Sequence, residues 1–431
     1  MSPRFGPTAE PVPFPACPTL PWLRYAESSG ATPGDIRFRM DKPQAQLSQV
    51  LSNRKLVLAG QVAFLPTGIL TTILGPMLPI LIARWAINDT QAGNLFLVQF
   101  LASLVGVQLS GVLLARFGFR PAFLLGLLLM AGGVATLYMG SLGLGLASVA
   151  TYGLGLGLII PSDNLLIAEI GSSSDSGPTS RAGAVSLLNF FWGVGAVFCS
   201  VMVAWTAAHK ILPFFLGSVA LFLVLLSLAM RNLPFPAAET SPESSSSWRE
   251  MARSPTIWLF AAVFFLYPGA ETAVGGWIGS YVSRLGPRAA SMASMMPAFF
   301  WLALKVGRAL GTAFLRHFSE RLVLRAGYAA GAAGIGLMLW APALSSVIGG
   351  ALITGLSFAT LYPITVARFS QRFGVAARSI GAVMFSLASV GPAVIPWMVG
   401  VISHATGSLR TGLLLPLGAT LILLLIHLFE W

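Results

Sequence analysis

Charged residues are scarce in this chain. They account for 9% of its 431 residues, whereas a soluble domain carries about a quarter. Cysteine is rarer still, because Cys17 and Cys199 are the only two, which excludes a secreted disulfide scaffold. The hydrophobic content of 55% falls in blocks of about twenty residues, so a disordered or nucleic-acid-binding chain is excluded despite a net charge of +12. The composition indicates a helical membrane protein with many spans.

The sequence also lacks the common signatures of catalysis and metal binding. Its four histidines are scattered near the ends of apolar blocks without metal-ligand spacing, at His209, His317, His404 and His427. A phosphate-binding Gly-Lys-Ser/Thr loop is absent, so ATP is not the energy source of this chain. We therefore expect no enzymatic activity, no metal site and no cofactor.

From Lys55 onward the chain contains twelve apolar segments, each long enough to cross about 30 Å of hydrocarbon as a helix. The expected spans are 56–83, 91–115, 120–140, 144–168, 182–207, 211–231, 256–283, 289–315, 321–341, 344–367, 379–403 and 408–429. The longest polar break follows the sixth span. The sequence therefore predicts an all-α membrane protein, in which 55–231 and 256–431 form two six-helix bundles joined by a cytoplasmic linker at 232–255.

Residues 1–54 differ from the rest of the chain. They are rich in proline, serine and charge, and they contain no apolar run of useful length. Such a segment cannot bury enough apolar surface to fold alone, so we expect a disordered cytoplasmic tail without a signal peptide. Met40 is an alternative initiator, and its use would remove the first 39 residues from the protein.

The distribution of lysine and arginine sets the expected orientation. With both termini cytoplasmic, nineteen of the 26 basic residues fall on the inner side. Two lie inside a span, and five fall outside: Arg84, Lys210, Arg284, Arg288 and Arg410. Because basic residues collect in cytoplasmic loops, we expect this topology, in a bacterial-type inner membrane.

The two halves of the chain repeat short patterns in the same order. The pair Gly111 and Arg116 after the second span returns as Gly311 and Arg316 after the eighth, an offset of 200. Two glycine-containing triplets in the fourth and fifth spans return in the tenth and eleventh at nearly the same offset. These matches predict two pseudo-symmetric halves related by an axis along the membrane normal.

The segment 111–120 resembles the loop motif between the second and third helices of the major facilitator superfamily. The resemblance implies a twelve-helix fold and a gating role for Gly111, Arg116, Gly118 and Arg120 on the cytoplasmic side. One position departs from the motif, since Ala115 stands where the family has an aspartate that helps to latch the two halves. This chain therefore lacks that latch residue.

Within the superfamily, the chain resembles the fucose–galactose–glucose proton symporters and the sodium-dependent glucose transporter-like proteins. The likeness is carried by four stretches: 161–164, 188–193, 267–277 and 307–308. Ile160 stands where the fucose-type symporter has a glutamate, and Asp163 beside Asn164 is closer to the sodium-dependent pattern. The resemblance implies transport of a monosaccharide together with H⁺ or Na⁺.

Four ionisable residues lie well inside the expected spans: Asp163, Glu271, Lys305 and Arg308. A charge at that depth costs at least a few kcal/mol, so it needs a partner, a water-filled cavity or a function. Pro161 frees a carbonyl close to Asp163, and transporters use such carbonyls to coordinate a cation or a substrate hydroxyl. We expect all four residues to couple ion movement to transport. Packing across helices is the alternative for Asp163, and a structural role is the alternative for Arg308.

Glu271 and Lys305 have more specific expectations. Glu271 lies near the middle of the seventh span beside a proline and several glycines, where a helix can bend, and we expect it to gain and lose a proton. Trp301, Lys305 and Arg308 follow i, i+4, i+7 spacing and should line one helix face. Lys305 is expected to be a counter-ion to Glu271 or Asp163, with binding of an anionic substrate as the alternative.

Amide groups bind the hydroxyls of a sugar, and aromatic rings bind its C–H face. Asn189 and Trp192 offer one of each on the same face of the fifth span. The full set of expected substrate-binding residues is Gln61, Gln99, Asn164, Asn189, Trp192, Trp277, Trp301, Tyr362 and Trp397. For each of them the alternative is packing, or an interfacial aromatic belt in the case of the tryptophans.

These observations predict a secondary active transporter that moves a monosaccharide or similar small polar solute by alternating access, coupled to H⁺ or Na⁺. The expected partners are the solute and the lipid bilayer, with no nucleic acid, and the chain is expected to be a monomer. A proton-driven exporter of amphipathic compounds is the second hypothesis, with a lining of Met292, Met295, Met296, Phe299 and Phe300. The third is a non-transporting sensor on the same fold.

Overall fold

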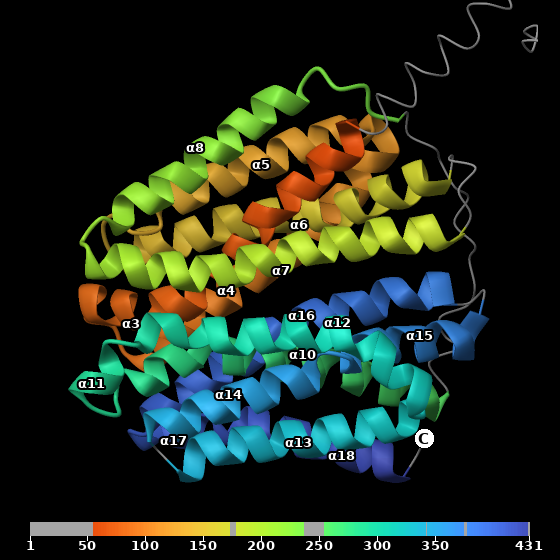
Figure 1. The fold of residues 1–431 in the computed structure, drawn as a ribbon. Helices are drawn as coiled ribbons and strands as arrows, with labels where there is room; N and C mark the ends of the chain where they lie inside the picture. Colours follow the sequence, from red (N-terminus) through yellow and green to blue (C-terminus); the bar gives the residue numbers. More distant parts are fainter. Residues whose placement is uncertain (1–54, 173–177, 237–253, 342, 375–376, 430–431) are drawn as a thin grey trace, which may run out of the picture. The chain divides into compact units, whose positions relative to one another are not determined.

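The computed structural model describes residues 55–172, 178–236, 254–341, 343–374 and 377–429, all within one compact unit, residues 55–431. The expected tail at 1–54 and most of the expected linker at 232–255 lie outside the described residues. The described residues contain helices and no strand, and twelve of the helices are long and apolar enough to cross a membrane (Figure 1). The all-α fold with twelve spans is confirmed.

The first half contains six spans. Their bounds are Lys55–Thr72 continued by α3 (Leu74–Trp85), α4 (Asp89–Phe117), α5 (Phe119–Thr136), α6 (Leu142–Ser172), α7 (Pro178–Ala208) and α8 (Leu212–Met230). A reciprocal pair of hydrogen bonds between Asn88 and Gln91 caps the start of α4. Gly118 follows α4 with a φ of 75°, a value that suits glycine, and α5 begins at the next residue.

The second half repeats this arrangement. Its elements are α10 (Pro255–Val282), α11 (Pro287–Ala290), the short η1 (Ala293–Met295), α12 (Met296–His317), α13 (Glu320–Trp340), α14 (Leu344–Phe358), α15 (Leu361–Phe373), α16 (Ala377–Thr406), α17 (Leu409–Gly412) and α18 (Leu414–Phe429). The helices α4 and α12 end at Phe117 and His317, an offset of 200 that matches the sequence repeat.

Three expected spans are interrupted helices, and proline accounts for each break. A proline has no N–H to donate to the carbonyl four residues earlier, and its ring crowds that carbonyl. Pro76, Pro363 and Pro416 each lie four residues after the point where a helix breaks, near residues 72, 359 and 412. The first, tenth and twelfth spans are therefore built from two helical pieces each.

Loops alternate between the two ends of the helices. We call the end that carries residues 118, 231–236 and 318–319 the Arg120 end, and the end that carries residues 86–88, 137–141 and 283–292 the Arg284 end. Across the two halves, α4 packs against α16, α7 against α12, and α3 against α10 (Figure 1). The second and fifth spans of one half thus meet the fifth and second spans of the other, as expected for pseudo-symmetric halves.

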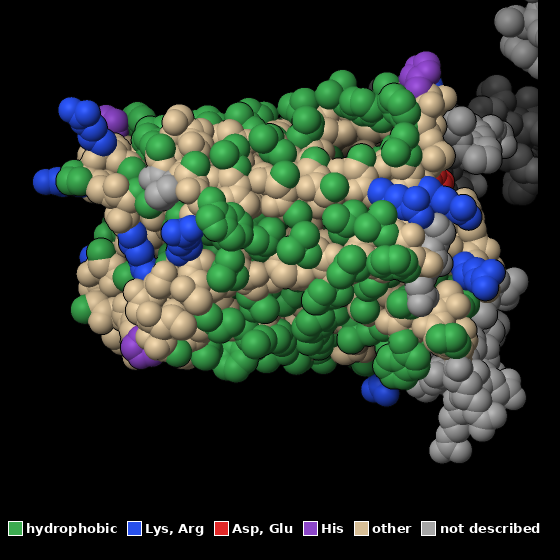
Figure 2. Space-filling model, turned by 90° about the horizontal axis from the view of Figure 1, so that it is seen from below, with side chains coloured by type: hydrophobic (Ala, Val, Ile, Leu, Met, Phe, Trp, Pro, Cys, Tyr) green, Lys and Arg blue, Asp and Glu red, His purple; other side chains and the backbone are tan. Residues whose placement is uncertain are grey.

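The outer surface of the helices is apolar between two basic fringes. Figure 2 shows hydrophobic side chains over the middle of one face, with lysine and arginine side chains gathered toward its two ends. Leucine and phenylalanine side chains are exposed along α4, α8 and α12, among them Leu109, Phe214 and Leu310. Such a band is what the hydrocarbon core of a bilayer requires, so the chain is an integral membrane protein.

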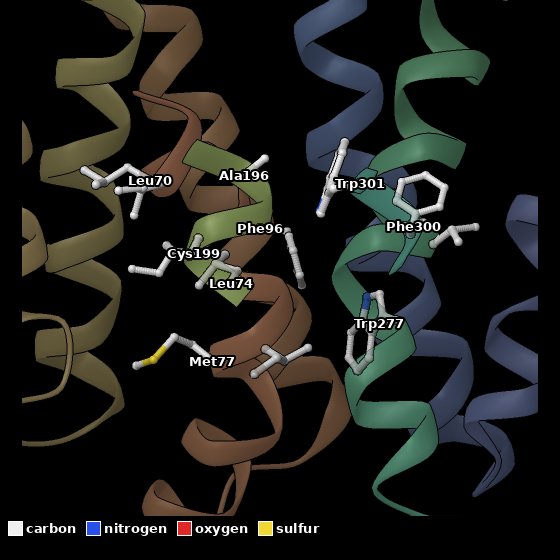
Figure 3. Close-up of a cluster of buried hydrophobic side chains, with 14 of the residues drawn as sticks. Leu70, Leu74, Met77, Phe96, Ala196, Cys199, Trp277, Phe300 and Trp301 are labelled. Atoms are coloured by element: carbon white, nitrogen blue, oxygen red, sulfur yellow. The ribbon is translucent and has the colours of Figure 1, made fainter. Parts of the chain in front are cut away.

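The apolar core joins the halves toward the Arg284 end only. The main cluster of buried side chains includes members of both halves, and Figure 3 shows Phe96, Trp277, Phe300 and Trp301 within it. Toward the Arg120 end, each half has its own smaller cluster. One surrounds Phe64 in the first half, and the other consists of residues of the second half only. Among the described residues, the hydrogen bonds, ion pair and ring contacts that join the halves lie in the middle or at the Arg284 end.

Candidate functional site

The carboxyl group of Glu271 lies near the middle of α10 and contacts the tyrosine one turn before it. The Tyr267 hydroxyl lies 2.5 Å from Glu271 Oε2 and 2.7 Å from the carbonyl oxygen of Phe358 in α14. A hydroxyl group carries one proton, so it can donate fully to only one of these two acceptors. A proton on Glu271 would let the carboxyl group donate to Tyr267 while Tyr267 donates to Phe358. The site therefore has a place for one additional proton.

Aromatic rings and a guanidinium surround this carboxyl group. Tyr267 stacks on Tyr362 of α15 with ring centroids 6.0 Å apart, and Phe264 meets Tyr362 edge-on at 5.9 Å. Glu271 and Arg308 are both close enough to the two tyrosines to act on them electrostatically. The helices α10, α12 and α15 thus bring together three residues singled out from the sequence, Glu271, Arg308 and Tyr362. Tyr267 is an addition that the sequence pattern did not indicate.

The Lys305 side chain reaches from α12 toward α7 in the other half. Its ammonium nitrogen lies 4.2 Å from the centroid of the Trp192 ring, and a Cβ at Gly193 would overlap its alkyl chain. Trp301, one turn earlier on α12, meets the same Trp192 ring edge-on at 5.6 Å. The expected face of α12 is therefore present, with Trp192 lying against it.

The expected ion pair of Lys305 is not formed in this conformation. Among the described residues no carboxylate oxygen lies within 4.0 Å of its ammonium, although Glu271 and Arg308 lie within electrostatic reach. The aromatic face of Trp192 takes the place of a counter-ion, because its ring quadrupole attracts a cation.

The same face of α12 carries donors that lack acceptors. Trp301 Nε1, Lys305 Nζ and Arg308 Nε are buried atoms without a hydrogen-bond partner among the described residues. Buried polar groups are paired in the great majority of cases, so three neighbouring orphans need an explanation. All three are donors, and none is an acceptor. A ligand rich in acceptor oxygens would complete the face.

Asp163 lies on α6 of the first half, toward the Arg120 end. The residue is fully buried, and neither carboxyl oxygen has a hydrogen-bond partner among the described residues. Gly60 of the first helix faces it so closely that a Cβ there would overlap Oδ1. Ile160 and Ile167, one turn on either side, belong to the apolar cluster around Phe64. The structure thus places an unpaired carboxyl group among apolar side chains.

Gln99 makes its hydrogen bonds within the first half. Its side chain is buried, donates to the Thr71 carbonyl at 3.3 Å and accepts from the Tyr152 hydroxyl at 2.9 Å. Both ends of the amide are therefore engaged by the protein. These contacts give Gln99 a packing role in this conformation.

The three other amides differ in their surroundings. Asn164 donates to the carbonyl of Ile160 in its own helix at 2.8 Å. Gln61 is buried, and Asn189 is exposed on α7 one turn before Trp192. Of the amides expected to meet substrate, Asn189 is thus the one nearest along the chain to the Trp192 side of the site.

Two of the expected aromatics hold the Arg284 end together. Trp277 is fully buried, its Nε1 donates to the Pro396 carbonyl at 2.9 Å, and its ring meets Phe96 of the other half (Figure 3). Trp397 Nε1 donates across the halves to Asn94 Oδ1 at 3.0 Å. Both indole N–H groups are satisfied by protein acceptors, so these two tryptophans pack the halves against each other.

A polar cluster that the sequence did not indicate closes the Arg284 end. Arg284, after α10, makes a bidentate ion pair with Asp89 at the start of α4, at distances of 2.5 and 2.9 Å. The Ser403 hydroxyl of α16 donates to the same carboxylate at 2.5 Å. Asp89 is buried, so one carboxylate of the first half is held by two elements of the second. We call Asp89, Arg284 and Ser403 the outer latch.

Glycines allow the backbones of the halves to meet beside the outer latch. A Cβ at Gly93 would touch the carbonyl oxygen of Trp397, and one at Gly400 would overlap that of Asp89. A Cβ at Gly75 of α3 would likewise meet the Gly275 carbonyl of α10. Small residues permit this close helix packing in membranes, so the Arg284 end is sealed by backbone surfaces as well as by the latch.

The loop motif at the Arg120 end makes one described contact. Arg120 donates to the Leu233 carbonyl at 2.9 Å, which ties the start of α5 to the segment after α8 within the first half. Gly118 supplies the turn between α4 and α5, while Gly111 and Arg116 are exposed. In the described part of the chain no side-chain hydrogen bond or ion pair of these residues reaches the second half, and their gating role stays a prediction.

The two buried aspartates should respond oppositely to the same substitution. Asp163→Asn is expected to raise the melting temperature of the purified protein by a few degrees, because an amide can donate to the carbonyl four residues earlier, as Asn164 does. Asp89→Asn removes the charge of a carboxylate that is paired with Arg284, so it should lower the melting temperature. Thermal unfolding in detergent at neutral pH measures both, and a lower melting temperature for Asp163→Asn would mean that its carboxylate has a stabilising partner.

Comparison with known proteins identifies the family. The protein-family model described as the Major Facilitator Superfamily matches residues 62–396 of this chain. The chain is 24% identical over 395 residues to Bypass of stop codon protein 6 of Saccharomyces cerevisiae, covering 81% of this chain and 77% of that protein. It is 25% identical over 324 residues to an uncharacterised MFS-type transporter of Yersinia pestis, covering 74% and 80%.

Solved structures share the fold. The nucleoside transporter NupG superposes with a TM-score of 0.71 at 12% identity, covering 86% of this chain and 99% of that one. The E. coli fucose:proton symporter FucP superposes with a TM-score of 0.57 at 17% identity, covering 88% and 99%. A D-xylose–proton symporter gives 0.64 at 14% identity, covering 88% and 97%. This chain belongs to the major facilitator superfamily, a family of transporters rather than enzymes.

Proposed function

We propose that this protein is a proton-coupled secondary transporter of a small, hydroxyl-rich solute the size of a monosaccharide. The solute would bind between the halves near the middle of the membrane, and the halves would open alternately toward the two sides. The site around Glu271 and α12 lies at this depth, and α7 and α12 approach it from different halves. Transporters of this kind bind substrate and coupling ion at the interface of their repeats.

The observation that carries the proposal is the contact of Glu271 with Tyr267. One hydroxyl proton faces two acceptors, and a proton on Glu271 would satisfy both contacts. A carboxyl group in this setting can take up a proton from one side and release it when its surroundings change.

The proposed class of solute follows from the lack of described hydrogen-bond acceptors for three donors in the site. The face of α12 offers three unpaired donors, and the rings of Trp192 and Trp301 lie beside them. Hydroxyl oxygens can accept from such donors, while the C–H face of a sugar ring can pack on an indole. The solved structures that share the fold include a nucleoside transporter, a fucose:proton symporter and a D-xylose–proton symporter, which is consistent with a solute of this class.

The structure favours this proposal over an exporter of amphipathic compounds. The methionines and phenylalanines expected to line such a cavity belong to the residue before η1, to η1 itself and to the start of α12, close to the Arg284 end. Met296 and Phe300 are fully buried in the main core cluster. The mid-membrane site instead presents charged and donor groups.

We further propose that the Arg120 end faces the cytoplasm of a bacterial-type inner membrane, with both termini on that side. The excess of basic residues supports this orientation. In it, the outer latch closes the external side. We also propose that residues 1–54 are a cytoplasmic tail and residues 232–255 a cytoplasmic linker, and that the protein is a monomer.

Uptake into proteoliposomes tests the function. Radiolabelled D-galactose, D-glucose, L-fucose, D-galacturonate and D-glucuronate would be supplied with an inward proton gradient, an inward Na⁺ gradient or neither. We expect accumulation of at least one of these solutes in the proton gradient only, and its loss on addition of a protonophore. Equilibration without accumulation in both gradients would contradict the proposal. Accumulation driven by Na⁺ alone would move the coupling site to Asp163, whose buried oxygens have no described partner.

A further inference from the structure

The proposed site holds more positive charge than its own acid can balance. Lys305 and Arg308 project from one face of α12. Glu271 acts electrostatically on Lys305, and both Glu271 and Arg308 act on Tyr267. Among the described residues, neither base has a carboxylate within 4.0 Å. The described ion pairs of the chain lie elsewhere, at Asp89 with Arg284 and at Glu320 with Arg368.

The two bases are held in place although the described residues supply neither with a carboxylate within 4.0 Å. The Lys305 alkyl chain lies against Gly193, where any side chain would overlap it, and its ammonium lies over the Trp192 ring. A cation–π contact offsets part of the cost of desolvating an ammonium. It leaves the N–H donors of Lys305 unpaired, and Arg308 Nε is unpaired as well.

A neutral sugar would leave this imbalance in place. Its hydroxyls can accept hydrogen bonds from the three donors of α12, but they bring no negative charge. A carboxylate brings two acceptor oxygens and one charge, and hydrogen bonds from lysine or arginine to a carboxylate are about twice as strong as those between neutral groups. The donor set therefore fits an anionic group better than another hydroxyl.

We propose that the solute is a hydroxy acid of monosaccharide size, whose carboxylate is held by Lys305 and Arg308 while its ring packs on Trp192 and Trp301. This inference rests on the proposed transport function and names its substrate class. It places the acidic end of the solute on α12 of the second half. The remaining hydroxyls would face α7 of the first half, where Asn189 lies one turn before Trp192.

Charge balance supports a solute with a single negative charge. The empty site with an ionised Glu271 contains two bases and one acid. A site loaded with one proton on Glu271 and one monoanion has the same net charge. The empty and the fully loaded carrier would therefore meet the same electrostatic cost when the halves move, whereas a carrier with only the proton or only the anion differs by one charge. This difference couples the two movements.

Matched pairs of ligands test the inference on the full-length protein. Isothermal titration in detergent would compare D-galactose with D-galacturonate and D-glucose with D-glucuronate, which differ by one carboxylate. D-glucose 6-phosphate tests a doubly charged anion. We expect at least one uronate to bind roughly tenfold or more tightly than its neutral partner, since hydrogen bonds to a charged group are the stronger class.

Variants of α12 show whether the gain comes from these residues. Lys305→Met and Arg308→Gln should each weaken uronate binding roughly tenfold to hundredfold and weaken binding of the neutral sugar by a smaller factor, so that the preference for the uronate falls. Lys305→Arg keeps the charge and should retain most of the preference. Arg316→Gln, at an exposed arginine of the same helix, is the matched control and should bind like the wild type. A monodisperse elution profile confirms that each variant is folded.

Three results would overturn the inference: equal or tighter binding of the neutral sugars, tighter binding of the phosphate, or uronate binding that Lys305→Met and Arg308→Gln leave unchanged. Absence of binding by all five ligands would overturn it as well. Uptake into proteoliposomes separates the failure of this inference from the failure of the transport proposal. Proton-driven accumulation of a neutral sugar but of neither uronate would show that the acidic substrate class is wrong while the transport function stands. Accumulation of none of these solutes would contradict transport itself.

Discussion

The Glu271→Gln variant is expected to exchange solute across the membrane but not to accumulate it. An amide can donate to Tyr267 as a protonated carboxyl group would, so the hydrogen bonds around the site persist. The amide cannot release a proton, however, and the solute then moves without one. A pH gradient of one unit can drive up to roughly tenfold accumulation, and the variant should lose all of it.

Two assays on the same proteoliposomes separate these outcomes. Net uptake in a proton gradient should fall to simple equilibration, while counterflow of labelled against unlabelled solute should continue at a rate that no longer depends on pH. Glu320→Gln is the matched control, since this acid pairs with Arg368 at the Arg120 end, outside the site. Accumulation by Glu271→Gln at the wild-type level would move the proton site to another residue.

Loss of the outer latch is expected to shift the protein toward the conformation that is open at the Arg284 end. Arg284→Ala removes a bidentate ion pair that joins the halves and leaves Asp89 with Ser403 alone. Hydrogen bonds between charged groups contribute about 1.5–3 kcal/mol, but the Arg284 side chain is 39% exposed, so we expect about 1–2 kcal/mol. That energy changes the ratio of the two conformations roughly 5- to 30-fold.

Distances between spin labels measure this shift. Labels at Ala83 and Ala405 lie on exposed positions of α3 and α16 at the Arg284 end, in a background without Cys17 and Cys199. Arg284→Ala should populate a longer distance, and the control Arg288→Ala, at an exposed arginine nearby, should not. The double variant Asp89→Arg with Arg284→Asp should restore the short distance in part. Unchanged distances in Arg284→Ala would show that the glycine contacts close this end without the latch.

The twelve spans could be predicted from the sequence because their signal is local. A helix that crosses hydrocarbon needs about twenty apolar residues in a row, and each such run can be read without knowing its neighbours. The three breaks were not predicted, although Pro76, Pro363 and Pro416 were visible. Other prolines, such as Pro161 and Pro268, lie within continuous helices, so proline alone does not decide where a helix is interrupted.

The candidate site was predicted only in part. The depth of a residue within a span can be read from the residues around it in the sequence. The side chain that it contacts usually belongs to another helix and cannot be read in this way. Spacing along α12 correctly placed Trp301, Lys305 and Arg308 on one face. Nothing in the sequence shows that Gln99 pairs with Tyr152, 53 positions away, or that Lys305 rests on Trp192 in place of an acid.

The outer latch was missed for the same reason. Asp89 and Arg284 are 195 positions apart, and each looked like an ordinary loop charge at the end of a span. A faint signal existed in the position of Asp89. Asp89 follows the capping residue Asn88 and is the first residue of a long membrane helix, where the helix dipole stabilises a negatively charged side chain.

The glycine contacts at the Arg284 end bear on the entropy of each transport cycle. Closing an interface of long side chains immobilises many rotamers each time, at up to about 1.5–2 kcal/mol for a flexible residue. Gly93, Gly400 and Gly75 present only backbone, which has a fixed shape before and after the halves meet. Among the described side chains that join the halves there, Arg284 is the longest flexible one, so it is expected to carry the largest single share of the conformational entropy lost on closure. A carrier that must close and reopen many times gains from a seal that needs so little reordering.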